Sequence, residues 1–259
     1  MGTRNERGNE VNNLIQWPTA IFWTAQWNPI IGCRPCSPAC ENCYAAAWAR
    51  RFGQSFEPHE SSQERPPRRG VVFCGNMTDL FGEWNDSPLD AIEATAKKAN
   101  ADATYLYLTK RVPPMSAVLS AIVMGCPYTD PEIFANHFFG FTAENQEWYE
   151  KRMNYCAQHF PAWANLWISA EPLLGEIDMC LYHYLMLPKW VVVGCESGPK
   201  RRPCKIEWVE SIVEQCRAAN VPVFVKQLDI GGKCVTDITK FPEHLRIRQV
   251  PWAKEGENK

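Results

Sequence analysis

The sequence has no long apolar run and no apolar leader. No stretch approaches the ~18 consecutive apolar residues of a membrane-spanning helix, and the opening residues, MGTRNERGNEVNN, are polar. Secretory signal peptides carry an apolar core, so these absences favour a cytoplasmic protein without a membrane partner. In a reducing compartment we expect the twelve cysteines to be free thiols.

A strong net charge is also missing. The formal charge is −2 and the isoelectric point is near 6.2, so the chain as a whole carries no electrostatic footprint for nucleic acid. One local basic patch, formed by Arg65, Arg68 and Arg69, lies in a stretch from 54 to 70 that has no apolar period. We interpret this stretch as a solvated surface loop.

Cysteine is concentrated in one short segment. Four of the twelve cysteines fall within eleven positions, at Cys33, Cys36, Cys40 and Cys43. A mononuclear zinc module normally needs two close pairs separated by a longer span, and no such span is present. Three thiolates on a loop that leads into a helix suit an iron–sulfur cluster with one iron open to a small molecule. From spacing alone, the third ligand beside Cys40 and Cys43 is either Cys33 or Cys36.

Short apolar runs alternate with helical segments along the chain. Helices are expected at 44–52, at about 88–100, after Pro113 and Pro114, after Gln146, and at 206–219. Near-continuous apolar strands between helices indicate a parallel sheet, and their number favours an α/β fold, a complete or partial (β/α) TIM-type barrel. The seven expected strands lie at 21–27, 71–75, 104–108, 137–141, 164–168, 190–193 and 221–225.

The length suits a single barrel domain over residues 1–259. Within it we expect residues 1–19 to form an N-terminal extension and 233–259 to form an irregular C-terminal tail. Polar residues follow the strands, where the loops of a barrel converge on one face. We therefore predict one pocket whose catalytic groups are Glu144, Glu171, Glu196 and Lys226. The alternative for each acid is a helix cap that stabilises the following helix.

These motifs resemble the radical S-adenosylmethionine (SAM) superfamily. More narrowly, they resemble a phage and bacterial family of radical-SAM-like proteins with C-x6-C-x2-C spacing. The resemblance extends over the cysteine segment and the blocks VFCGNMTDLF, LYLTKR, FGFTAENQ, SAEPLLG, VVVGCESGP and VPVFVKQ. It implies that Cys33, Cys40 and Cys43 bind a [4Fe-4S] cluster, with Cys36 as an extra thiol. The glycine-rich GGE signature of the superfamily is absent.

The resemblance also implies a function and its partners. Asn76 and Asp79 are expected near the amino group of SAM, and Glu144 and Glu196 near its ribose or the substrate. The expected enzyme cleaves SAM reductively to a 5′-deoxyadenosyl radical, using a reductant such as flavodoxin or ferredoxin. The substrate suggested by the phage association is DNA or a nucleotide, with rearrangement of a modified thymidine in the host cytoplasm.

Two other functions stay open at this point. One is a non-enzymatic zinc- or iron–sulfur-binding phage accessory protein. The other is a hydrolase that uses Glu171 and Glu196 without a cluster. Tyr44 and Trp48, on the helix that follows the cysteines, are interpreted as core residues, with shielding of the cluster as the alternative. Cys195, after the sixth strand, is the isolated cysteine best placed to reach a ligand.

Overall fold

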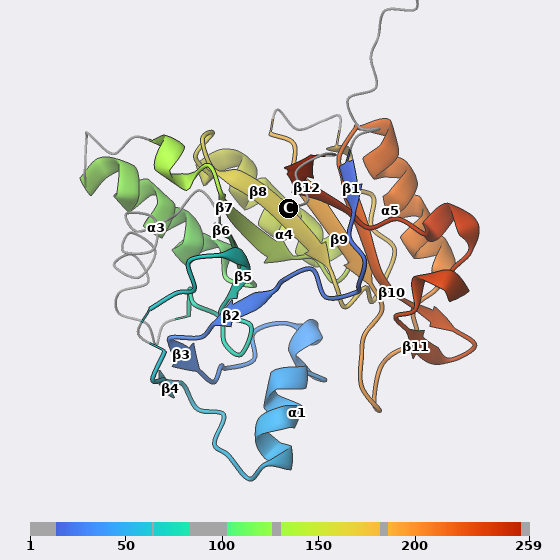
Figure 1. The fold of residues 1–259 in the computed structure, drawn as a ribbon, viewed down its shortest axis with the longest axis horizontal. Coiled ribbons are helices and arrows are strands. Elements are labelled where there is room, and N and C mark those ends of the chain that lie inside the picture. Colours follow the sequence, from blue (N-terminus) through green and yellow to red (C-terminus); the bar gives the residue numbers. More distant parts are fainter. Residues whose placement is uncertain (1–13, 64, 83–102, 126–130, 182–185, 255–259) are drawn as a thin grey trace, which may run out of the picture.

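A curved sheet of eight strands forms the body of the protein (Figure 1). The computed structural model describes residues 14–63, 65–82, 103–125, 131–181 and 186–254. Seven strands run parallel, in the spatial order β10-β9-β8-β7-β6-β5-β2, and β11 pairs antiparallel with β10 at one edge. The strands of this sheet are β2 (Ala25–Trp27), β5 (Gly70–Cys74), β6 (Ala103–Thr109), β7 (His137–Thr142), β8 (Asn165–Ala170), β9 (Trp190–Gly194), β10 (Val223–Ile230) and β11 (Lys233–Val235).

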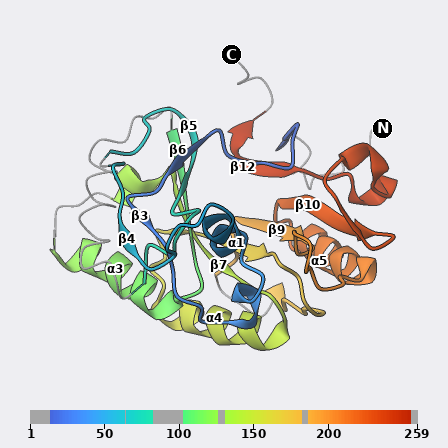
Figure 2. The same cartoon turned by 90° about the horizontal axis from the view of Figure 1, so that it is seen from below.

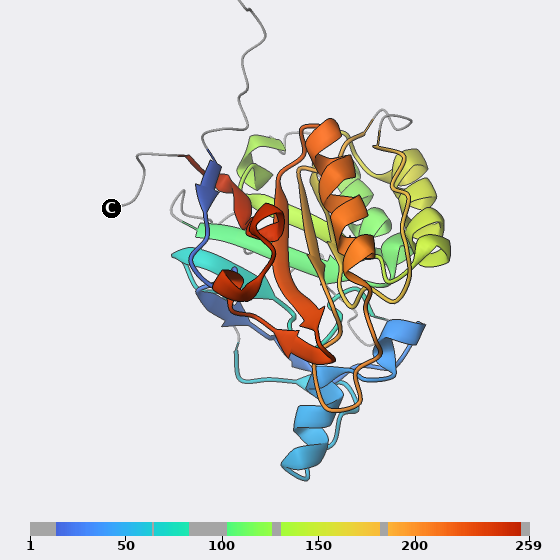
Figure 3. The same cartoon turned by 90° about the vertical axis from the view of Figure 1, so that its right-hand side faces the viewer.

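Helices cover the outer face of the curved sheet. In Figures 2 and 3, α3 (Val112–Gly125), α4 (Gln146–His159) and α5 (Ile206–Ala218) lie along this face. The helix α1 (Tyr44–Arg51) stands apart from them and projects from the body. The helix expected at about 88–100 lies outside the described residues. Short 3-10 helices occupy Pro38–Cys40, Pro131–Phe134, Ile238–Lys240 and Glu243–Leu245.

The sheet is a half-barrel. All seven predicted strands are present and parallel, so the partial (β/α) barrel is confirmed. The complete TIM-type barrel is wrong, because β2 and β11 remain at opposite edges of the described sheet and do not pair. The cause is local: Gly231 and Gly232, both at positive φ, turn the chain back into β11 as an antiparallel hairpin. Among the described residues, no further parallel strand pairs with β2 or β11.

Both faces of the sheet are buried, which explains the continuous apolar strands. Along β9, for example, Val191 and Val193 pack in the outer core under the helices. Trp190 and Val192 point the other way, into an aromatic inner core on the concave face. Phe22 lies at the centre of this inner core, and its ring contacts those of Trp23, Phe73, Trp167, Trp190 and Phe224.

The two ends of the described chain pack together across the open side. β1 (Leu14–Gln16) pairs antiparallel with β12 (Gln249–Lys254), so the tail after Gly232 is more regular than expected. The buried side chain of Arg248 donates to the carbonyls of Thr236 at 2.6 Å and Pro18 at 3.5 Å. A further small sheet pairs β3 (Ile30–Ile31) with β4 (His59–Glu60). Of these two strands, β4 lies within the expected loop 54–70. Within the described ranges, none of the helices is both long and apolar enough to cross a bilayer.

Candidate functional site

A cavity of about 490 Å³ lies at the carboxyl ends of the parallel strands. This volume is within the usual range for small-molecule sites. The segment 33–43, named the cysteine loop, forms one wall, and all four of its cysteines line the cavity. The thiols are half-buried and unoxidised. Other lining residues come from strand tips and the inner core, including Phe22, Trp23, Asn76, Asp79, Lys110, Arg111, Glu171, Cys195, Glu196 and Lys226.

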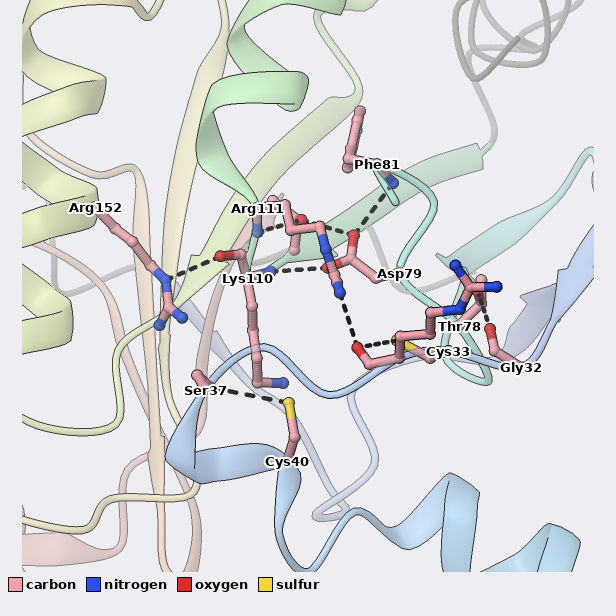
Figure 4. Close-up of polar contacts among 12 residues, drawn as sticks. Gly32, Cys33, Ser37, Cys40, Thr78, Asp79, Phe81, Lys110, Arg111 and Arg152 are labelled. Carbon is pink, nitrogen blue, oxygen red and sulfur yellow. Dashed lines mark hydrogen bonds and ion pairs between the residues drawn. The ribbon is translucent and has the colours of Figure 1, made fainter. Parts of the chain in front are cut away.

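The cysteine loop is shaped by the residues at its two ends. Gly32 has φ +95°, and a Cβ at this position would lie 2.5 Å from the carbonyl oxygen of Glu57, so only glycine fits. Thr78 Oγ1 donates to the Gly32 carbonyl at 2.6 Å, as Figure 4 shows. At the other end, Cys43 is the N-cap residue of α1. The loop therefore enters from a tight turn and leaves directly into a helix.

Asp79 and Arg111 hold the first half of the cysteine loop (Figure 4). Arg111 Nη1 lies 3.1 Å from Asp79 Oδ2, and Arg111 Nη2 donates to the carbonyl of Arg34 at 2.8 Å. The Asp79 carboxylate also accepts bonds from Thr109 Oγ1 at 2.6 Å, Lys110 N at 3.1 Å and Phe81 N at 3.1 Å. Both of its oxygens are thus engaged by the protein. Asp79 links the tips of β5 and β6 to the loop.

Glu196 and Arg202 hold the second half of the loop. The side chain of Arg202 contacts both carboxylate oxygens of Glu196, with Nη2–Oε1 at 2.5 Å and Nε–Oε2 at 3.1 Å. Asn42 Nδ2 donates to Glu196 Oε2 at 3.0 Å, and Arg202 Nη1 lies 3.1 Å from Glu41 Oε2. Burial tends to raise the pKa of Glu196, but the bonds from Arg202 and Asn42 outweigh it and lower this pKa. Glu196 therefore stays ionised.

The thiols of the cysteine loop differ in their electrostatic surroundings. Burial and the nearby Asp79 carboxylate raise the pKa of Cys33 to about 11. A hydrogen bond from Cys36 lowers the pKa of Cys40, against its burial, and the charge of Lys110 also lowers it. The same bond raises the pKa of Cys36. Of Cys33, Cys36 and Cys40, Cys40 is therefore the thiol that ionises most readily.

Glu171 and Lys226 form an ion pair in the wall of the cavity. Lys226 Nζ lies 2.7 Å and 2.9 Å from the two oxygens of Glu171, and Gln227 Nε2 donates to Oε1 at 3.2 Å. The ammonium group also lies 5.9 Å and 5.7 Å from the ring centroids of Phe22 and Trp23. Charge and aromatic surface are thus combined where the cavity meets the inner core.

Glu144 is not part of the cavity lining. Its side chain is fully buried, and Oε2 lies 2.5 Å from Nη1 of Arg152 on α4. Arg152 also donates to the carbonyls of Thr142 at 2.7 Å and Lys110 at 3.2 Å. Through these bonds the buried pair connects α4 to the ends of β6 and β7. The predicted set of four charged residues is brought together only in part, as Glu171, Glu196 and Lys226.

Two aromatic residues of α1 depart from the expected core packing. The side chains of Tyr44 and Trp48 are 55% and 47% exposed. Tyr44 nevertheless lines the cavity, and its hydroxyl donates to the backbone carbonyl of Asn76. The Asn76 side chain accepts a bond from Asn28 Nδ2 at 2.7 Å. The core interpretation is wrong because α1 buries only Ala45 and Ala49 against the body.

Sequence reasoning missed Asn42 and Arg202, which both bond to Glu196. For Asn42 the available signal was its place between Cys40 and Cys43. Arg202 belongs to the run Lys200-Arg201-Arg202, which follows Glu196 closely. A basic run just after a strand-tip acid is compatible with the pairing that the structure shows.

The cysteine loop can be compared with the requirements of a single metal ion and of a cluster. In the part of the chain that the structure describes, no three His, Cys, Asp or Glu side chains form a group able to hold a metal ion. A [4Fe-4S] cluster has different requirements, because each thiolate binds a different iron, so its sulfurs stand farther apart. Four free thiols on one loop, facing one cavity, fit that chemistry.

The fold and the cavity define a half-barrel α/β protein with a thiol-lined site at the carboxyl ends of its parallel strands. Residues 18–241 match a family described as "Protein of unknown function (DUF5131)". The chain belongs to this family, and the matched region includes the cysteine loop and every strand of the large sheet. No curated protein and no solved structure matches the sequence or the fold.

Proposed function

We propose that the protein is a radical SAM enzyme whose cysteine loop holds a [4Fe-4S] cluster. The observation that carries the proposal is the placement of four free thiols at the carboxyl ends of a parallel half-barrel, on a loop held at both ends. When bound, the cluster would supply the electron that cleaves SAM to methionine and a 5′-deoxyadenosyl radical. The electron itself would come from a reductant such as flavodoxin or ferredoxin.

Cys33, Cys40 and Cys43 are the proposed ligands. Cys36 is the extra thiol, and it donates to Cys40. Lys110 and Arg111 place positive charge beside the loop, which favours thiolates over thiols. Asp79 and Glu196 act in this proposal as positioning residues, because their carboxylates are already bonded to loop-holding groups. Asn76 stays a proposed contact for the amino group of SAM.

The Glu171–Lys226 pair is the proposed substrate end of the cavity. It offers a hydrogen-bond acceptor and a donor beside the rings of Phe22 and Trp23. Such a combination suits a flat, polar group such as a nucleobase. Within the proposal the substrate is a modified thymidine in DNA, and the reaction is a radical rearrangement. The walls of the cavity would keep the radical away from water.

Anaerobic reconstitution with iron and sulfide tests the proposal. We expect a brown protein with about four iron and four sulfide per chain, the number a [4Fe-4S] cluster requires. Incubation with SAM and dithionite should then release 5′-deoxyadenosine. The Cys180→Ala variant is the matched control, because Cys180 lies outside the cavity lining. Stoichiometric zinc in a colourless protein that yields no 5′-deoxyadenosine would overturn the proposal in favour of an accessory metal-binding protein.

A further inference from the structure

Helix α1 presents a stripe of exposed aromatic rings. Tyr44, Trp48 and Phe52 follow one another at intervals of four residues, so they share one face of the helix and its C-cap. Their side chains are 55%, 47% and 57% exposed. The rings of Trp48 and Phe52 pack together with centroids 4.8 Å apart. Large apolar side chains gathered on a surface in this way usually mark a contact site.

Arg51 places a positive charge beside this stripe. Arg50 and Arg51 lie in the last turn of α1, and Arg51 lies 5.9 Å from the ring centroid of Phe52. The neighbouring acids are already paired: Glu41 with Arg202 at 3.1 Å and Glu57 with Arg34 at 3.4 Å. Over the described ranges, no carboxylate forms an ion pair with Arg50 or Arg51.

The stripe leads into the cavity. Tyr44 lines the cavity at one end of the stripe, and the exposed residue Ile21 lines it nearby. Figure 3 shows α1 projecting from the body of the protein. The cavity that Tyr44 lines is also lined by the four thiols and the Glu171–Lys226 pair, so a ligand lying along α1 meets this cavity at Tyr44.

We propose that α1 is a docking surface for an unpaired nucleic-acid strand. Bases stack on Trp48 and Phe52, a phosphate pairs with Arg51, and one nucleotide enters the cavity past Tyr44. Aromatic rings beside arginines are the combination that binds single strands with little sequence preference. This proposal rests on the proposed function in one respect, namely that the cavity accepts a nucleotide. A lipid surface fits less well, because it would cover the cavity with hydrocarbon.

Fluorescence anisotropy with a labelled single-stranded DNA of about 15 nucleotides tests this surface, with the protein as purified and after cluster reconstitution. Trp48→Ala and Phe52→Ala should each weaken binding about tenfold, the effect of losing one stacked base. Trp48→Phe should restore most of it. Arg51→Gln should lower the slope of log K against log salt by about 0.7. Arg217→Gln, at the exposed end of α5, is the charge-matched control and should change neither quantity.

The outcomes separate this proposal from the proposed function. Binding that depends on Trp48 in a protein that takes up no iron supports the surface and overturns the radical SAM function. A reconstituted protein that cleaves SAM but binds DNA no better than Trp48→Ala overturns the surface alone. Trp48-dependent binding to vesicles of anionic lipid, or Trp48-dependent self-association in sedimentation, without DNA binding also overturns it. A duplex of the same sequence should bind more weakly, because its bases are already stacked.

Discussion

Asn42 donates a hydrogen bond of 3.0 Å to Glu196, which lies 154 residues away in the sequence. Asn42 sits between Cys40 and Cys43, and Glu196 follows β9. On the other side of the loop, Arg111 makes the equivalent connection from the tip of β6 to the carbonyl of Arg34. Two strand tips therefore help to fix the position of the thiols over the cavity.

Asn42→Ala should loosen the cysteine loop without unfolding the protein. Glu196 keeps its bonds to Arg202, so no buried charge is left alone, and we expect a loss of about 1 kcal/mol in the free energy of unfolding. Iron should leave the reconstituted variant several-fold faster when a chelator is added. Asn165→Ala, which removes two hydrogen bonds far from the loop, is the control and should lose iron at the wild-type rate.

The four cysteines of the loop should differ in their importance. Cys33→Ala, Cys40→Ala and Cys43→Ala should each abolish the broad visible absorption of the cluster, because a second iron loses its ligand. Cys36→Ala should retain it. The opposite result for Cys33 and Cys36 would reverse the ligand assignment, and retention of the absorption in all four variants would refute a cluster in this loop.

Asp79→Asn should strongly destabilise the fold. The buried Asp79 carboxylate faces the charge of Arg111 and the backbone N–H of Lys110, and an amide NH2 there would oppose both donors. Removing one partner of a buried ion pair costs about 3–5 kcal/mol. Urea unfolding monitored by tryptophan fluorescence measures the change. Asp237→Asn, in the exposed pair with Lys240, is the control and should be nearly neutral.

His137 should make stability fall in mild acid. Burial lowers its pKa to about 3, from about 6.5 in the unfolded chain, so the folded state keeps the ring neutral. The stability it contributes is complete above pH 6.5 and is lost as pH falls towards 3. Between pH 7.5 and pH 5 this amounts to about 2 kcal/mol. His137→Phe keeps the stacking with Tyr105 and Phe139 and should flatten the pH profile by that amount. Parallel profiles would contradict the assignment.

Lys226→Met should separate cluster assembly from turnover. The ammonium group bonds only to the substrate end of the cavity, so the visible absorption of the reconstituted protein should be unchanged. Substrate conversion should fall at least tenfold, the effect of losing about 1.4 kcal/mol of transition-state stabilisation. Lys189→Met, at an exposed position before β9, supplies the matched control. Full turnover in Lys226→Met would assign the pair with Glu171 to structure alone.

The strands were predictable because both faces of the sheet are buried. Trp190 and Val191 point to opposite faces of the sheet, yet both are apolar because both faces are buried. The continuous apolar run at 190–193 is therefore typical of a buried parallel strand. The sequence predicted a complete or a partial barrel but could not decide between them, because closure of the sheet depends on contacts between distant segments. Phe22 fills the concave face from outside the sheet, and the turn at Gly231 and Gly232 reverses the last strand.

The candidate site was predictable as a set of positions but not as a set of roles. The rule that strand tips converge placed Glu171, Glu196 and Lys226 around one cavity. This rule did not show that Glu144 would instead be buried in an ion pair with Arg152, which lies two turns further along the chain in the next helix. The sequence around each acidic residue does not reveal whether an arginine from another segment forms an ion pair with it.

β2 and β11 lie at the two edges of the described sheet and do not pair with each other, so hydrogen bonds between them do not fix the width of the half-barrel. In a closed barrel, strand number and stagger together fix the diameter. Here the width of the opening depends on side chains, above all on the ring of Phe22 wedged among Trp23, Phe73 and Trp190. Exchanging that one ring for a smaller side chain would enlarge the chamber without altering any strand register. Phe22 is thus a position from which the size of the cavity can be changed by redesign.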